Sequence, residues 1–409
     1  MINRDFEKYY IFIVWSKASH IKDLAKKEII KKFDLLSCGE TKWSKKFIHQ
    51  NFLRFYSELA LGTSDKVKEV GQDSFHFFIV KDINPKFEYR SDASGRVKKV
   101  NSSIIDLKSK LRKKTDVAFG VHCSDSKHEF VQNCAMIFGS KYEATLSSII
   151  DNKPFFVDET SKAIAESGWD SFEQLFNYLN KTTQYVVLRN PRELIDGFEH
   201  GKGDVDILCN DRKKFMSLAN GIPIWESKNF FHVKVGGEMV LFDVREKGEG
   251  YLDERWIEHL LNNGSVSEFQ YLRTLNKDDY FFSHLYYALV NKRSIPDKYN
   301  SRLANLAKEI GSYDLVFKNG IIDKDLAIFT LKGYMLNNNF TFLLPSDPSV
   351  YINTYSVNKI FPSAHVYWYQ ILSRKIDTKV LYYFNRLKRK LKSSSVFYNT
   401  YNSIRGMIS

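Results

Sequence analysis

The chain of 409 residues is too long for one ordinary domain and predicts two or three. With 43% hydrophobic and 27% charged residues it is not disordered, and its formal charge of +13 raises the question of a nucleic-acid or membrane partner. The four cysteines are scattered and include no C-x-x-C pair, which excludes a zinc ribbon. The apolar run that starts at Tyr9 is too short to span a membrane, so we expect a cytoplasmic protein.

Residues 1–150 alternate strand-like and helical segments, which predicts an α/β (α+β) domain. Short apolar runs predict strands at 10–15 and 75–80. Apolar residues at helical spacing predict helices at 21–33 and 126–138.

A connecting segment at residues 151–182, with a predicted helix at 167–179, leads to a second sheet domain at 183–330. Its strands are expected at 184–188, 205–208, 230–235 and 239–244. Gly236-Gly237 predicts a tight hairpin between the last two strands. From Trp256 the pattern becomes helical, with Gly311 as an expected helix C-cap, and residues 331–409 form a C-terminal region.

The most informative segment is Gly203-Asp-Val-Asp-Ile-Leu208, which reads as a strand. Because side chains alternate along a strand, Asp204 and Asp206 are expected on one face, with apolar neighbours in the core. Asp243 stands in a later strand, and three clustered carboxylates predict a divalent cation, Mg²⁺ or Mn²⁺. A second D-x-D, at Asp323 and Asp325, is explained as the start of a helix.

These acidic strands resemble the nucleotidyltransferase superfold of polymerase β-like enzymes, in the form found with bacterial surface-polysaccharide genes. The resemblance covers about 183–311 and implies a mixed sheet followed by helices. It implies catalytic and metal-binding roles for Asp204, Asp206 and Asp243. One departure is Val187-Leu-Arg-Asn190, where the family usually has Gly-Gly or Gly-Ser.

The expected activity is metal-dependent transfer of a nucleotidyl or phospho-sugar group from a nucleotide donor to a glycan or lipid-linked precursor in surface-polysaccharide synthesis. Arg189 and Arg245 are candidates for holding the phosphate. Three alternatives stay open. They are a fukutin-like transferase using a CDP-activated donor, an RNA-modifying nucleotidyltransferase, and a catalytically inactive interaction protein.

A second motif, Val121-His-Cys-Ser-Asp-Ser126, resembles the active-site stretch of nucleoside diphosphate kinases, in which a His before Gly-Ser-Asp-Ser takes up a phosphoryl group. The resemblance covers most of residues 8–140 and implies a ferredoxin-type domain. It implies nucleotide or phosphate contacts by His122, Tyr56, Arg90 and Arg112.

The chain departs from that family at three places near the expected site. Trp15-Ser-Lys17 replaces Lys-Pro-Asp, Phe119 replaces an Asn, and Asn133 replaces the Glu that orients the histidine. Both a phosphohistidine at His122 and a purely structural kinase-like domain stay open.

The C-terminal tail, residues 374–409, holds nine basic side chains and one acid, and so supplies +8 of the net charge. Residues 380–391 place apolar and aromatic side chains at helical spacing, with the basic ones mostly elsewhere. This composition favours peripheral attachment to anionic lipid on the inner face of the cell membrane. RNA binding and a solvated terminal helix are the alternatives.

Overall fold

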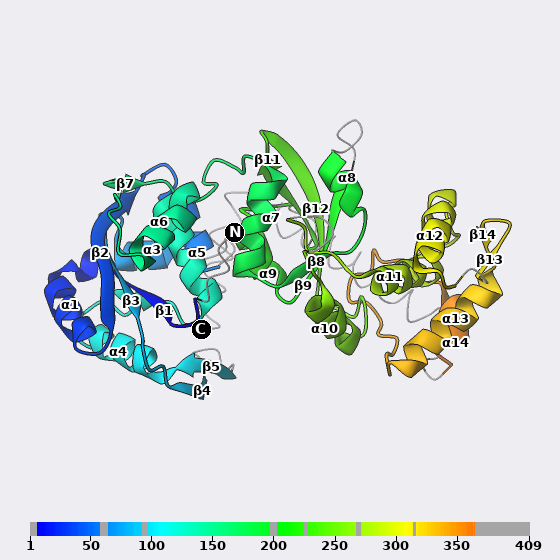
Figure 1. Ribbon diagram of the computed structural model, residues 1–409, viewed down its shortest axis with the longest axis horizontal. Helices are drawn as coiled ribbons and strands as arrows, with labels where there is room; N and C mark the ends of the chain where they lie inside the picture. Colours follow the sequence, from blue (N-terminus) through cyan, green and yellow to red (C-terminus); the bar gives the residue numbers. More distant parts are fainter. Residues whose placement is uncertain are drawn as a thin grey trace, which may run out of the picture. The chain divides into compact units, whose positions relative to one another are not determined.

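The computed structural model describes residues 6–57, 64–91, 97–196, 203–224, 228–266, 271–313, 316–362 and 364. It is a mixed α/β chain, as expected, and it divides into two compact units (Figure 1). The first unit comprises Met1–Arg245 and Ser265–Thr274, and the second comprises Glu246–Gly264 and Leu275–Ser409. The expectations for the tail, 374–409, lie outside the described residues.

The first unit opens with a five-stranded sheet in the order β6-β1-β3-β2-β7. β1 pairs antiparallel with β3 and β6, β2 pairs antiparallel with β3, and β7 runs parallel to β2. The strands expected at 10–15 and 75–80 are confirmed as β1 and β3. The five are β1 (Tyr9–Val14), β2 (Asp34–Trp43), β3 (Phe75–Lys81), β6 (Val121–Cys123) and β7 (Thr160–Ser161).

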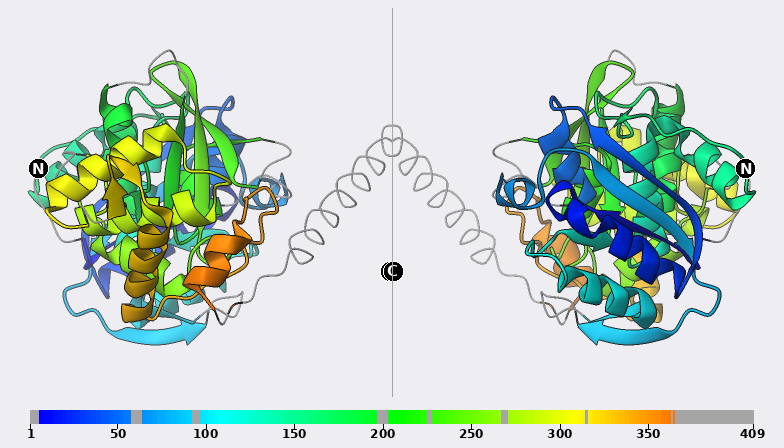
Figure 2. Two further views of the ribbon diagram at one scale, coloured as in Figure 1. Left: turned by 90° about the vertical axis from the view of Figure 1, so that its right-hand side faces the viewer. Right: turned by 90° about the vertical axis from the view of Figure 1, so that its left-hand side faces the viewer.

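Helices cover both faces of this sheet, which explains why β1 and β3 are apolar on both sides (Figure 2). α1 and α4 pack on one face around Phe12, and α2 and α5 pack on the other around Ile13. The helices expected at 21–33 and 126–138 are confirmed as α1 and α5. The helices are η1 (Ser16–Ile21), α1 (Lys22–Ile30), α2 (Ile48–Phe55), α3 (Ser64–Val70), α4 (Ser102–Arg112), α5 (Lys127–Phe138), η2 (Gly139–Lys141) and α6 (Tyr142–Ile150).

A separate two-stranded ribbon, β4 (Phe87–Ser91) and β5 (Val97–Asn101), precedes α4 (Figure 1). Asn101 ends the ribbon and caps α4, because its side chain accepts a hydrogen bond from the backbone N–H of Ser103.

The second sheet of this unit has the order β10-β11-β12-β9-β8, so the two strands that carry the acidic motifs are neighbours. Gly236 and Gly237 join β11 to β12 with φ values of 59° and 90°, which confirms the expected tight hairpin. The strands are β8 (Tyr185–Val187), β9 (Asp204–Cys209), β10 (Ile222–Pro223), β11 (Phe230–Val235) and β12 (Glu238–Glu246). The helices beside them are α7 (Phe172–Thr182), α8 (Pro191–Asp196) and α9 (Arg212–Leu218).

The helix expected at 167–179 begins later, at Phe172, because Ser171 is its N-cap and accepts a hydrogen bond from the Gln174 N–H. The residues before it are extended instead. Trp169 forms a bridge with Val235 of β11 and is almost fully buried. The two sheets share one continuous apolar core within this unit.

The second unit is mainly helical, as expected for the chain beyond Trp256. Gly311 adopts φ 72° and ends α12 as the expected C-cap, and Asp323 caps α13, which accounts for the second D-x-D. The elements are α10 (Glu254–Asn263), α11 (Lys277–Val290), α12 (Asp297–Ile310), β13 (Phe317–Lys318), β14 (Ile321–Ile322), α13 (Lys324–Asn337) and α14 (Thr354–Ile360). Among the residues described, none of the helices has the length and apolar character needed to cross a membrane.

Candidate functional site

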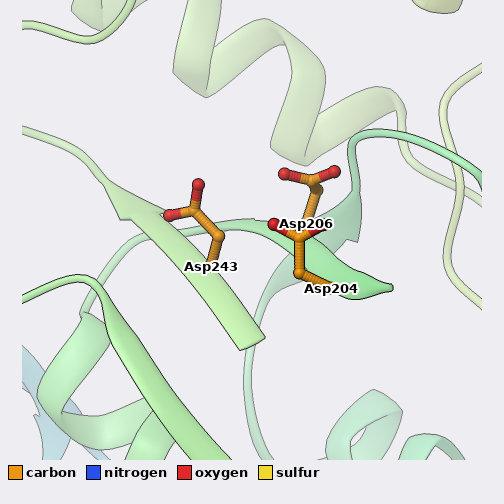
Figure 3. Close-up of side chains that lie close together, drawn as sticks. All are labelled: Asp204, Asp206 and Asp243. Carbon is orange, nitrogen blue, oxygen red and sulfur yellow. The ribbon is translucent and has the colours of Figure 1, made fainter. Parts of the chain in front are cut away.

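The three predicted acids meet on neighbouring strands. Asp204 and Asp206 rise from the same face of β9, and Asp243 rises beside them from β12 (Figure 3). One carboxylate oxygen from each lies within 4.8 Å of the others. Asp206 and Asp243 are buried and Asp204 is half-buried, so the cluster opens to solvent through Asp204. The same-face prediction for Asp204 and Asp206 is confirmed.

Two arginines lie against this cluster. Arg189, just after β8, forms a buried ion pair with Asp206, and the backbone N–H of Leu188 donates to the Asp206 carbonyl at 2.9 Å. Arg245, two residues after Asp243 on β12, approaches the Asp243 carboxylate with Nε at 3.0 Å from Oδ1 and Nη2 at 3.1 Å from Oδ2. The structure therefore places both predicted phosphate-holding arginines beside the three acids.

Three carboxylates lie close together in a largely buried site, and Arg189 and Arg245 pair with two of them. Burial raises the pKa of the Asp243 carboxyl, and the nearby Asp206 carboxylate raises it further, against the lowering effect of the two arginines. Asp243 Oδ1 receives no hydrogen bond from the described residues, although it is in ion-pair contact with Arg245.

Three carboxylates held close together in a largely buried site repel one another, and a bound cation would relieve that repulsion. All three side chains offer hard oxygen ligands, which suit Mg²⁺ or Mn²⁺ better than thiophilic metals. The residues present therefore fit the expected divalent metal. Among the described residues, this is the one group of three or more acids, histidines or cysteines with ligand atoms close enough to hold an ion.

The loop after β8 makes a sharp turn at Asn190, which the sequence analysis did not predict. Asn190 adopts φ 55°, the left-handed conformation that Gly takes most readily and that Asn tolerates best among other residues. Asn190 thus makes a sharp turn directly after β8 and Arg189. The Asn-Pro dipeptide, which favours a turn, was the available sequence signal.

The histidine motif forms a second, separate site. His122 lies on β6, is only 4% exposed, and its Nε2 is 2.8 Å from Nδ2 of Asn133. The ring also lies 4.8 Å from the Phe55 ring and 5.7 Å from the Tyr56 ring, centroid to centroid. Asn133 of α5 therefore contacts the histidine directly.

The two arginines expected near His122 have different surroundings. Arg112 donates from Nε to the Val121 carbonyl at 2.7 Å, next to His122 on β6. Arg90 forms ion pairs with Glu88 and Asp106 on the surface. The structure thus brings Tyr56 and Arg112 close to β6. The described ion pairs of Arg90 are instead with the surface residues Glu88 and Asp106.

Sequence reasoning missed one residue of the histidine site. Glu129 places Oε1 at 3.7 Å from His122 Nε2, and its Oε2 accepts a hydrogen bond from the Asp125 N–H at 2.7 Å. Burial and the nearby Asp125 raise the pKa of the Glu129 carboxyl. The signal that could have found it is the Ser126-x-x-Glu129 spacing, which is typical of a capping box.

Comparison of the chain with protein-family models, curated proteins and solved structures finds no match in any of the three.

Proposed function

We propose that this protein is a metal-dependent transferase that moves a nucleotidyl or phospho-sugar group from a nucleotide donor to a hydroxyl of a glycan or lipid-linked precursor. The observation that carries the proposal is the cluster of three carboxylates with two arginines beside it. The acceptor class rests on the resemblance to nucleotidyltransferase-like proteins of surface-polysaccharide synthesis.

Asp204, Asp206 and Asp243 would hold Mg²⁺ or Mn²⁺. When bound, the ion supplies Lewis-acid polarisation of the donor phosphate and charge neutralisation. The chain's own contribution is positioning. Arg189 and Arg245, which compensate Asp206 and Asp243 in the structure, would turn part of their hydrogen bonding toward the donor phosphates.

In the proposed step, the acceptor oxygen forms a bond to phosphorus while phosphorus loses its bond to the leaving phosphate oxygen. The leaving group is pyrophosphate for a nucleoside triphosphate and a nucleoside monophosphate for a nucleotide-linked sugar. Asp243 would take the hydroxyl proton, since burial raises the pKa of its carboxyl and so makes it the better base.

For the first sheet we propose a nucleoside-diphosphate-kinase-like, ferredoxin-type arrangement. The strand order β6-β1-β3-β2, with α1 and α4 connecting strands on one face, supports this proposal. His122 is buried and its Nε2 is engaged by Asn133, which favours a structural role over phosphoryl transfer.

The test is to incubate the protein and Mn²⁺ with acceptor glycans and each donor class in turn, and to measure the released product. Pyrophosphate release from a nucleoside triphosphate indicates nucleotidyl transfer. Release of CMP from a CDP-polyol indicates the fukutin-like alternative, and UMP or CMP from a nucleotide-linked sugar indicates phospho-sugar transfer.

One test variant and one control variant are compared in this assay. Asp243→Asn removes a proposed ligand and base, whereas Asp158→Asn makes the same change at an exposed position. We expect release to be lost in the first and kept in the second. Absence of release from every donor, or equal release by both variants, would contradict the proposal.

A further inference from the structure

The ribbon of β4 and β5 exposes one of its two faces. Because cross-strand partners share a face, the side chains of Phe87, Tyr89, Val97 and Lys99 rise from the same side of the ribbon. The exposed fractions are 44% for Phe87, 76% for Tyr89 and 65% for Val97. A two-stranded ribbon with two exposed aromatic rings therefore lies beside α4 at the edge of the first unit (Figure 1).

The opposite face attaches the ribbon to the first unit. Val100 is buried, and Arg90 forms an ion pair with Asp106 of α4. Lys98 Nζ lies 3.8 Å from Oδ2 of Asp125, just before α5. An isolated two-stranded ribbon is only marginally stable, so it depends on contacts of this kind. The exposed rings are on the other side and take no part in these contacts.

The exposed face is cationic as well as aromatic. Lys99 is the cross-strand partner of Tyr89, and its Nζ lies 5.5 Å from the centroid of the Phe87 ring. The described residues of this face include no acid. Residues 97–119, which form β5, α4 and the segment after α4, hold seven basic and two acidic side chains. That excess of five is as large as the excess of all residues 1–373 together, so the positive charge outside the tail is concentrated here and predicts an anionic partner.

The placement of the rings and the lysine favours a single-stranded nucleic acid over a lipid surface. Side chains two residues apart on one face of a strand are about 7 Å apart, so Phe87 and Tyr89 can each stack on one base of an extended strand. Lys99, beside both rings, can then pair with a backbone phosphate. Insertion of the same face into a bilayer would carry the Lys99 ammonium toward the hydrocarbon together with the rings, which is unfavourable.

We propose that the exposed face of the β4–β5 ribbon binds single-stranded nucleic acid, with Phe87 and Tyr89 stacked on two successive bases and Lys99 on a phosphate. The proposal does not depend on the proposed transferase activity. Binding at this face tolerates any base sequence, because every base has an aromatic face on which a ring can stack. It weakens with salt, because it includes a phosphate contact.

The first experiment measures binding of the full chain to a labelled oligouridine of about 12 nucleotides by fluorescence anisotropy. Tyr89→Ala weakens binding at least about fivefold, because stacking on one base is lost, whereas Tyr89→Phe keeps the ring and binds as wild type. Lys99→Gln lowers the slope of log affinity against log salt by about 0.7. Tyr355→Ala, which removes an exposed tyrosine of the second unit that also has a lysine over its ring, leaves the affinity unchanged. Absence of binding, or an affinity indifferent to Tyr89→Ala, overturns the proposal.

The second experiment locates the contact and separates it from the tail and from lipid. Ultraviolet crosslinking of the full chain to the oligouridine, followed by trypsin, should place a nucleotide on the peptide of residues 87–90, which lies between the cleavage sites at Lys86 and Arg90. Crosslinks confined to residues 374–409 would assign the binding to the tail and overturn the proposal. If Tyr89→Ala reduces retention on anionic vesicles and leaves the affinity for oligouridine unchanged, the ribbon is a lipid-binding surface and the proposal is wrong.

Discussion

Replacement of Asp204 by asparagine should stabilise the metal-free protein, although it removes a proposed ligand. One carboxylate oxygen from each of the three acids lies within 4.8 Å of the other two. At that distance two like charges repel by about 0.9 kcal/mol in water and about 3.5 kcal/mol at an effective dielectric constant of about 20. Asp204 is half-buried and the two arginines offset part of the repulsion, so we expect removal of its charge to relieve about 0.5–1 kcal/mol of repulsion.

The assay is thermal unfolding with a chelator and then with Mg²⁺. In chelator, Asp204→Asn should raise the Tm by about 1–2 °C. With Mg²⁺ at ten times its Kd, wild type should gain about 1.4 kcal/mol and Asp204→Asn should gain nothing. Asp158→Asn, an exposed control, should behave as wild type in both conditions. The reasoning is refuted if Asp204→Asn unfolds earlier than wild type in chelator, or if Mg²⁺ stabilises both equally.

Three further predictions follow from the remaining features. Because the pKa of the Glu129 carboxyl is raised, its ionisation opposes folding, so the free energy of unfolding of wild type should fall between about pH 5 and pH 8. Denaturant unfolding should show that Glu129→Gln removes this fall, whereas Glu173→Gln, at an exposed position, keeps it. The same pH dependence in wild type and Glu129→Gln would count against the prediction. Incubation with a γ-labelled nucleoside triphosphate should give no acid-labile phosphoprotein at His122, and stoichiometric labelling that is lost in His122→Ala would show otherwise. Deletion of residues 374–409 should abolish flotation with anionic liposomes; retention of RNA, and not of vesicles, by the full chain would favour the RNA alternative.

Local patterns were sufficient to predict the acidic face of β9 and the Gly236-Gly237 hairpin. Period-two alternation fixes which side chains share a strand face, and two adjacent glycines permit a turn that needs positive φ. The arrival of Asp243 beside Asp204 could not be derived in this way. It depends on β9 and β12 being neighbours in the sheet, and this strand order is set by tertiary packing rather than by local sequence.

Other features depend on packing that no local pattern contains. The start of α7 moves to Phe172 because Trp169 is needed in the core, where its Nε1 donates to the Ala219 carbonyl at 2.7 Å. Likewise, the ion pair between Arg189, just after β8, and Asp206 of β9 depends on the pairing of these two strands, which the sequence spacing does not predict. The contact between Asn133 and His122 is visible only once α5 has packed against the sheet.

The central claim is that the three carboxylates form a divalent-metal site for a nucleotide donor. The most direct test is to titrate Mn²⁺ into the protein and to measure the bound ion by electron paramagnetic resonance, with and without donor nucleotide. The account predicts one Mn²⁺ per chain, bound more tightly when nucleotide is present, and lost in Asp204→Asn but not in Asp158→Asn. Absence of Mn²⁺ binding at millimolar concentration, or binding unchanged in Asp204→Asn, would contradict it.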